Sequence, residues 1–414
     1  MDKNTKQIGR NAFYLYILTF SNYFLSFLLL PYLSRTLSVE GFGLIGFSAT
    51  FVLFFQSLIE FGFMISATAL IAKNRSNHNK ISKLISAIMY AKLLLVLLAV
   101  AIFVISIILI PMVRNNLVII SLYFISSIFI ALLPDFYFRG LENMKIITIR
   151  TVVVRILTLL LIVSIVKDEL QIVYIPIIMI IGNAFGLFLT FRQMLKEGVR
   201  IEKVPLSFAI LQIKDSFMYY ISRMAVSVNQ FAASFLLGLK YSPMSVQMGL
   251  FSGASKISAA GEMMVHPLSD SLFPHMVNKK DYKLFKRVVV IGGILWCLAI
   301  GVIFIFARPL TVFMLGESYA DAADILRILL LSTFISFFSN FFGYNALVPL
   351  GKGKQANLAI VYSAIYTFSG GVILWATNNI NLISVSFLVV GINVVVLVYR
   401  VSVFVRARRT GDKI

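Results

Sequence analysis

The sequence predicts an all-α membrane protein with twelve transmembrane helices. The chain has 414 residues, of which 59% are hydrophobic and only 13% are charged, about half the charged share of a soluble protein. Because one span of a bilayer core about 30 Å thick needs roughly 20 apolar residues, twelve spans would occupy about 240 residues. Little of the chain remains for an extramembrane catalytic domain, so we expect a protein that is not an enzyme and that works within the membrane.

Long apolar windows separated by short charged loops define the individual spans. We interpret them as helices because a backbone exposed to lipid must satisfy its own hydrogen bonds. The first six predicted spans are 11–33, 44–72, 85–113, 117–138, 149–166 and 170–191. The second six are 213–238, 246–274, 288–307, 323–349, 358–376 and 382–404. We therefore expect an N-terminal six-helix lobe (1–191), a basic cytoplasmic linker (192–212) and a C-terminal six-helix lobe (213–414).

The basic residues predict the orientation of these spans. Most of the 37 Lys and Arg residues fall on the side that holds the N-terminus, and this side is the cytoplasm by the positive-inside rule. The loops on the opposite side carry only Arg35, Arg114, Lys167, Lys240, Arg308 and Arg327. Both termini are therefore expected in the cytoplasm. The same distribution accounts for the net charge of +20 without nucleic acid, because basic loops meet the anionic inner leaflet.

The two halves are expected to be a parallel repeat. Shifting the chain by about 206 residues lays the first span on the seventh and the second on the eighth, and it places Gly43 on Gly249. Each half has an even number of spans, so both halves enter the membrane from the same side. A pseudo-twofold axis along the membrane normal relates such halves in many transporters.

Charged residues within the spans are the candidate functional residues. Each costs at least about 2.5 kcal/mol at the centre of a helix and usually faces water or the interior of the bundle. The cations are Lys92, Arg155, Arg223 and Lys256, and the anions are Glu60, Asp135, Glu262 and Asp270. The cations could bind an anionic headgroup, with the guanidinium of Arg223 binding phosphate through two donors. The alternative is mutual neutralisation in ion pairs, such as Arg223 with Glu60, Lys256 with Glu262, or Asp135 with Arg155.

Three titratable residues share one face of the eighth span. Glu262, His266 and Asp270 recur every four residues, which places them one above another on a helix. Together with Glu60 they are candidates for binding a coupling ion, H⁺ or Na⁺. The alternative is a solvated helix end. No other cofactor and no metal site is expected.

Three segments resemble a known family. The segment PYLSRTLSVEGFGLIGFSATF (31–51), with Arg35, Leu37, Glu40 and two glycines, resembles the junction of the first two spans in polysaccharide exporters. These exporters belong to the multidrug/oligosaccharidyl-lipid/polysaccharide (MOP) superfamily. The segments MGLFSGASKISAAGEMMVHPLSDSLFPHM (248–276) and ESYADAADILRILLLS (317–332) are similar to the eighth span and to the approach to the tenth span.

Within this superfamily the chain looks most like the Wzx-type O-antigen flippases. The resemblance implies a V-shaped, MATE-like pair of six-helix lobes in the bacterial inner membrane. It implies the transfer of undecaprenyl-pyrophosphate-linked oligosaccharide from the cytoplasmic to the periplasmic leaflet by alternating access. A polysaccharide polymerase and a chain-length regulator would be partners. We expect Arg223 and Lys256 to contact the pyrophosphate, and Lys92 and Arg155 to guide it inward. The alternatives are a cation-coupled drug antiporter and an O-antigen polymerase or multispan glycosyltransferase.

Overall fold

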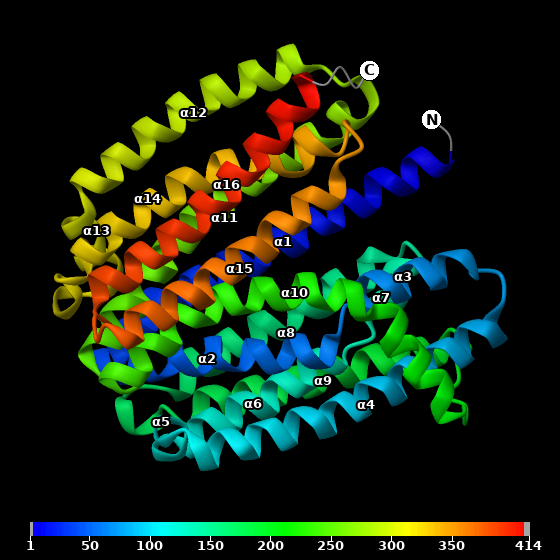
Figure 1. The fold of residues 1–414 in the computed structure, drawn as a ribbon. Coiled ribbons are helices and arrows are strands. Elements are labelled where there is room, and N and C mark those ends of the chain that lie inside the picture. The colour runs from blue at the N-terminus through cyan, green and yellow to red at the C-terminus, as the bar shows by residue number, and fades with distance from the viewer. Residues whose placement is uncertain (1–2, 410–414) are drawn as a thin grey trace. The chain divides into compact units, whose positions relative to one another are not determined.

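The fold consists entirely of helices in the part of the chain that the structure describes (Figure 1). The computed structural model describes residues 3–409 and, at the start of the chain, the side chains of residues 10–11, 13–21, 24–25 and 27–36. The two ends, for which the charge distribution predicts a cytoplasmic location, lie outside the described residues. The elements are α1 (Lys3–Thr36), α2 (Val39–Glu60), α3 (Phe63–Lys73), α4 (His78–Leu109), α5 (Pro111–Asn115), α6 (Leu117–Leu132), α7 (Asp135–Gly140), α8 (Met144–Ile165), η1 (Glu169–Gln171), α9 (Tyr174–Lys196), α10 (Leu206–Tyr241), α11 (Val246–Lys279), α12 (Tyr282–Ile305), α13 (Ala307–Leu315), η2 (Glu317–Tyr319), α14 (Ala322–Asn340), η3 (Phe341–Asn345), α15 (Gly353–Ala376) and α16 (Leu382–Arg409).

Nine helical segments within residues 3–409 are long and apolar enough to cross a membrane. The protein is therefore a multi-pass membrane protein. The other three predicted spans lie in α1, α10 and α11, which have 34, 36 and 34 residues. These three helices are also long enough to span a bilayer. The count of twelve spans stays a prediction.

Interruptions well inside a predicted span occur in the second, fourth and tenth spans. The second span breaks between α2 and α3, where Phe61 and Gly62 adopt φ values of 44° and 78°, a left-handed conformation that suits glycine. The fourth span breaks between α6 and α7 at Pro134, which has no N–H to donate to the helix ladder. In the tenth span α14 runs into a π-helical turn, η3, with a ψ of −116° at Gly343.

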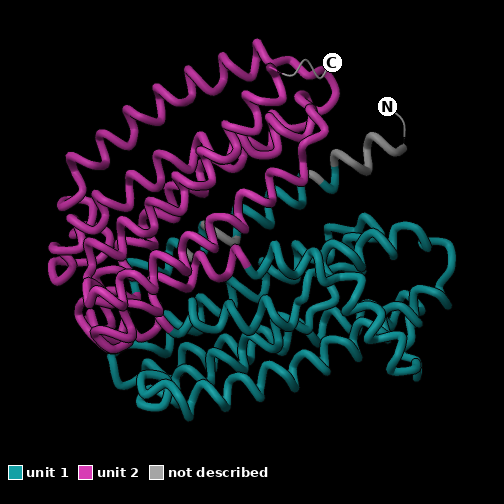
Figure 2. Tube along the Cα trace, in the orientation of Figure 1, with its two compact units in different colours: residues 1–32, 48–224 teal, residues 33–47, 225–414 magenta. Residues whose placement is uncertain are grey.

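The chain forms two compact units (Figure 2). Unit 1 contains residues 1–32 and 48–224, and unit 2 contains residues 33–47 and 225–414. All three boundaries fall inside helices, in α1, α2 and α10. The lobe boundaries expected from the sequence, on either side of residues 192–212, stay a prediction.

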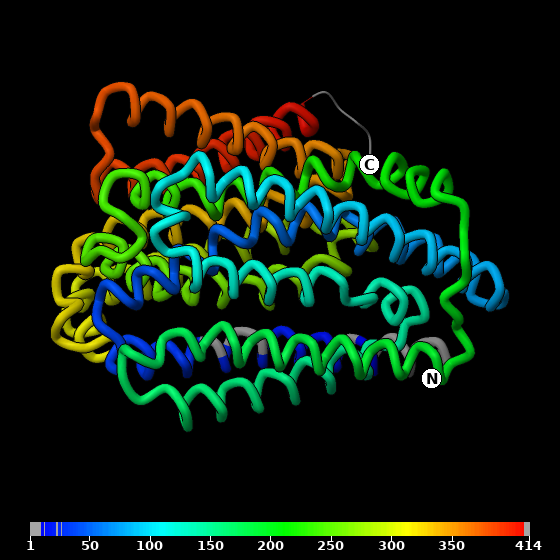
Figure 3. The backbone as a smooth tube through the Cα atoms, turned by 90° about the horizontal axis from the view of Figure 1, so that it is seen from below, coloured from blue at the N-terminus to red at the C-terminus, as the bar shows by residue number. Residues whose placement is uncertain are grey.

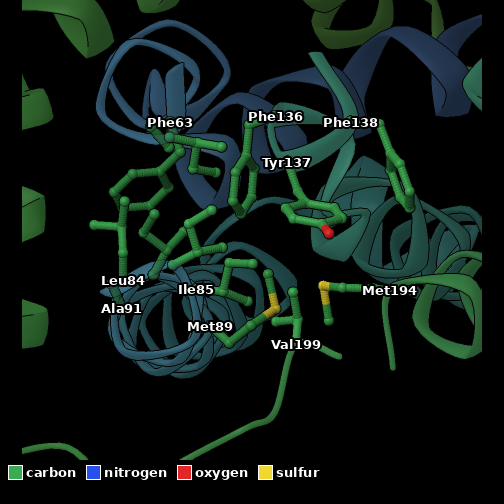
Figure 4. Close-up of a cluster of buried hydrophobic side chains, with 14 of the residues drawn as sticks. Phe63, Leu84, Ile85, Met89, Ala91, Phe136, Tyr137, Phe138, Met194 and Val199 are labelled. Atoms are coloured by element: carbon green, nitrogen blue, oxygen red, sulfur yellow. The ribbon is translucent and has the colours of Figure 1, made fainter. Parts of the chain in front are cut away.

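Unit 1 has an aromatic and aliphatic core around the short helix α7 (Figure 4). Phe136, Tyr137 and Phe138 are each at most 1% exposed and pack with Phe63 of α3, Ile85 of α4 and their neighbours. Burying rings of this size contributes strongly to stability. The core therefore holds α7 against α3 and α4, although the chain is interrupted on both sides of α7.

The segment between α9 and α10 is shorter than the predicted linker 192–212. Because α9 continues to Lys196 and α10 begins at Leu206, only residues 197–205 lie outside the helices. This segment crosses one end of unit 1 (green in Figure 3). Its backbone N–H groups at Arg200 and Glu202 donate to the hydroxyls of Ser82 and Ser86 of α4, at 3.1 and 2.8 Å. The segment is therefore tied to the beginning of α4.

In unit 2 the segment 33–47 packs closely on α11. A Cβ placed on Gly43 would lie 2.7 Å from the backbone nitrogen of Gly249, and one on Gly46 would overlap Ser252. Each of these pairs is separated by 206 residues, so positions that are equivalent in the proposed repeat contact each other. Such self-equivalent contacts occur beside a twofold axis, and they support the parallel repeat.

Candidate functional site

Lys256 is the candidate headgroup contact in unit 2. It lies ten residues after the first residue of α11, which places it about 15 Å along the helix axis. Its ammonium is 4.4 Å from the ring centroid of Phe42, a distance at which the face of the ring attracts a cation. Of the side chains that the structure describes, none forms an ion pair with Lys256. The pair of Lys256 with Glu262, one of the alternatives from the sequence, is therefore not formed.

Glu262, His266 and Asp270 all lie on α11, which is continuous from Val246 to Lys279 although it contains Pro267. Glu262 and His266 are half-buried and Asp270 is exposed. Within the described part of the chain, none of the three makes an ion pair. Their role in binding a coupling ion therefore stays a prediction.

In unit 1, Arg223 of α10 pairs with Glu60, the last residue of α2. The distance from Nη2 to Oε2 is 3.3 Å, and Glu60 also accepts a hydrogen bond of 2.8 Å from Gln56. The ion pair is the neutralising alternative that the sequence left open. Arg223 is nevertheless 52% exposed, so part of its side chain is open to the surroundings.

The contacts of α10 explain why Arg223 meets Glu60. At the break between α2 and α3, the ring of Phe61 stacks on Tyr220 with a centroid distance of 4.2 Å. One turn away, the hydroxyls of Ser66 and Ser216 are 2.7 Å apart. These contacts hold the first half of α10 along the broken second span and place Arg223 beside Glu60.

Lys92 is buried in α4, with 2% of its surface exposed. Its ammonium donates hydrogen bonds to the carbonyl oxygens of Ala131 and Leu133, at 2.6 and 3.0 Å. It also lies 5.2 Å from the ring centroid of Phe136. The side chain thus ends at the break between α6 and α7.

Asp135 pairs with Arg150 of α8, and not with Arg155 as one alternative had it. The guanidinium of Arg150 reaches both carboxylate oxygens, at 2.5 and 3.0 Å, and it also donates to Thr190. Arg150 is only 8% exposed. In the sequence it is one of several cations at a loop end, so counting charges could not distinguish it. Arg155, five residues further along α8, is half-buried.

A second buried cation that the sequence analysis missed is Arg400 of α16. Its guanidinium donates to the carbonyl oxygens of Ser339 and Ala356, at 2.6 and 3.0 Å. A Cβ on Gly343 would lie 2.8 Å from its Nη1. Its position within the predicted span 382–404 is the sequence feature that could have identified it. Like Lys92, it donates hydrogen bonds to carbonyl oxygens beside an interrupted helix.

Comparison with known proteins identifies the family. A family model described as "Polysaccharide biosynthesis protein" matches residues 8–280, which is more than half of the chain. The chain belongs to this polysaccharide biosynthesis protein family. The match confirms the resemblance to polysaccharide exporters, and it includes two of the three segments that carried it.

Two relatives of this family member resemble it over most of their length. A protein of Escherichia coli (strain K12) named "Putative O-antigen transporter" is 26% identical over 373 residues, which are 88% of this chain and 89% of that protein. A protein of Shigella dysenteriae with the same name is 25% identical over 366 residues, 86% and 90% of the two chains.

Solved structures show that this member of the polysaccharide biosynthesis family has the MATE fold. An inward-facing multidrug resistance MATE family transporter of the MOP superfamily superposes with a TM-score of 0.66 at 14% identity, covering 92% of this chain and 94% of that one. The Vibrio cholerae MATE transporter VcmN superposes with a TM-score of 0.60 at 18% identity, covering 98% and 96%. At these identities the likeness concerns the fold alone.

Proposed function

We propose that the protein is a flippase for undecaprenyl-pyrophosphate-linked oligosaccharide, the repeat unit of an O antigen or a related surface polysaccharide. It would move this lipid from the cytoplasmic to the periplasmic leaflet of the bacterial inner membrane, with both of its termini in the cytoplasm. Membership of the polysaccharide biosynthesis family, the names of two relatives and the MATE fold support this proposal.

The observation that carries the proposal is the environment of Lys256. A pyrophosphate that bears sugars cannot cross hydrocarbon alone, because its charges and hydroxyl groups would lose their hydration. An ammonium deep in a spanning helix offsets this cost when no carboxylate already neutralises it. Lys256 meets this condition, since its described neighbour is the ring of Phe42 and an ammonium has three N–H donors.

In unit 1, we propose Arg223 as a separate contact for the headgroup during its transfer. Its guanidinium is 52% exposed, and a guanidinium can form two parallel hydrogen bonds with a phosphate. Arg155 of α8 is proposed to guide the headgroup inward. Lys92 is almost completely buried and its ammonium is hydrogen bonded, so we assign it a different role below.

The driving step in this proposal uses the row on α11. Glu262, His266 and Asp270 bind a coupling ion, H⁺ or Na⁺, and its release is linked to alternating access of the headgroup from the two sides of the membrane. No covalent step is needed. A polymerase and a chain-length regulator would receive the exported repeat units.

The proposal is tested by complementation in a bacterium that lacks its own O-antigen flippase. The wild-type chain should restore the lipopolysaccharide ladder on a gel. Lys256→Ala should lose it, because removing a charged contact costs about 2 kcal/mol, roughly a thirtyfold loss of headgroup binding. Lys256→Arg should keep part of the activity.

Lys240→Ala is the matched control for this experiment. Lys240 is an exposed lysine at the end of α10 that binds Asn378, so the ladder should remain. A wild-type chain that leaves the ladder absent but confers resistance to cationic dyes would replace the proposal by a drug antiporter. A normal ladder with Lys256→Ala, at equal protein level, would remove Lys256 from the headgroup site.

A further inference from the structure

The break between α6 and α7 borders a small cavity in unit 1. Its volume is about 80 Å³, which is room for a few water molecules or one small ion. Its lining includes Glu60, Lys92, Ala131, Leu133, Asp135 and Phe136. They come from four helices and from the break itself, so the cavity is formed by the tertiary fold and not by one helix end.

The break supplies oxygen ligands at membrane depth. Proline at position 134 cannot donate to the helix ladder, and α6 ends at Leu132. The carbonyl oxygens of Ala131 and Leu133 are turned toward one point, where the Lys92 ammonium binds both. Carbonyl oxygens of interrupted helices are the groups with which membrane transporters coordinate small cations.

The carboxylates beside the cavity add negative charge to the same place. Glu60 and Asp135 both line it, and each already has an arginine partner, Arg223 and Arg150 respectively. Neither carboxylate forms an ion pair with the Lys92 ammonium. The ammonium is therefore held by two carbonyl dipoles and the face of Phe136, with the two carboxylates in its surroundings. Oxygen atoms of these two kinds are the ligands that hard cations prefer.

We propose that this cavity is a site for a monovalent cation, and that the ammonium of Lys92 is its permanently attached occupant. The long side chain carries the charge from α4 to the break in the fourth span. The carbonyl oxygens are satisfied without an ion from solution. Removal of the ammonium creates a binding site for Na⁺ or for a small alkylammonium ion.

The second half of the chain repeats this arrangement with a different cation. Position 339 is equivalent to position 133 under the shift of 206 residues, and it precedes the π-helical turn of the tenth span. The carbonyl oxygen of Ser339 accepts a hydrogen bond from Arg400, as that of Leu133 does from Lys92. The two buried cations come from unrelated helices, α16 and α4. A positive charge at this carbonyl is therefore a shared requirement of both halves.

The experiment uses the full chain in detergent with Lys92→Ala. Thermal unfolding is measured in choline chloride, and then with increasing methylammonium or Na⁺ at constant ionic strength. The variant should unfold at a lower temperature in choline, whose quaternary ammonium has no N–H to donate to the carbonyl oxygens. The midpoint should rise with the small cations and then saturate. At ten times the dissociation constant, the unfolding equilibrium constant should fall about elevenfold.

Lys256→Ala is the control, since the ammonium of Lys256 meets a ring and not two carbonyl oxygens. Its midpoint and that of the wild type should not rise with methylammonium, and any rise in Na⁺ should be the same in these two proteins and smaller than in Lys92→Ala. A Lys92→Ala midpoint that is the same in choline, Na⁺ and methylammonium would overturn the proposal.

A second variant covers the case in which Lys92→Ala does not fold. Adding Glu60→Gln removes one negative charge from the cavity, so the double variant should fold and should need less cation than the single variant. The comparison measures the coupling between the two sites. Failure of the double variant to recover would contradict the proposal, because the deficit would then not be one of charge.

Discussion

Gly249→Ala is expected to separate α11 from the segment 33–47 and to destabilise the protein by about 3 kcal/mol or more. An ideal Cβ at this position would overlap the carbonyl oxygen of Val39, and backbone atoms cannot move aside as a flexible side chain can. Close backbone approach between helices in membranes commonly depends on small residues. The measurement is the midpoint of thermal unfolding in detergent.

Gly301→Ala is the matched control for Gly249→Ala. Gly301 lies in α12, and a Cβ there would meet nothing within 4 Å. Alanine should stabilise this helix by roughly 0.5–1 kcal/mol, because glycine loses more conformational freedom on folding. Equal midpoints for the two alanine variants would show that the contact at Gly249 is not tight.

Arg150→Met is expected to cost about 3–5 kcal/mol, because it leaves the carboxylate of Asp135 buried without its partner. The exposed fractions of the two side chains are 8% and 13%, so water cannot replace the guanidinium. Since Asp135 also lines the Lys92 cavity, the loss should disturb the break between α6 and α7 as well. Thermal unfolding again provides the measurement.

Two further variants serve as controls for Arg150→Met. Asp135→Leu combined with Arg150→Met should regain most of the loss, because both charges are then absent. Arg327→Met should cost less than about 1 kcal/mol, since its partner Asp324 is 82% exposed. If Arg150→Met were as mild as Arg327→Met, the pair would have no structural importance.

The helical nature of the protein and most of its helices could be predicted from hydropathy alone. Runs of about 20 apolar residues have few alternatives to a membrane helix. The ends of helices could not be predicted in this way, because a helix that leaves the bilayer continues in water when nothing stops it. This is why α9 and α10 extend into the predicted linker 192–212 and leave only residues 197–205 outside helices.

The breaks within spans are marked in the sequence by single residues that have little effect on the mean hydropathy of a window. Gly62 and Pro134 each mark one, but the surrounding residues are apolar enough to form a continuous window. The ion-pair partners of the charged residues within the spans were even harder to predict from the sequence. Asp135 has Arg155 and Arg150 at similar distances in sequence, and only the tertiary packing of α8 on α9 and α7 selects Arg150.

The boundaries between the two units lie at positions 32/33, 47/48 and 224/225, within α1, α2 and α10. Each connection between the units is therefore a continuous helix and not a flexible loop, so a displacement of one unit would have to bend these helices. The least resistant of the three crossings is that of α1, where Pro31 removes one ladder hydrogen bond next to the boundary. A proline beside a unit boundary therefore makes this part of α1 easier to bend than an unbroken helical ladder would be.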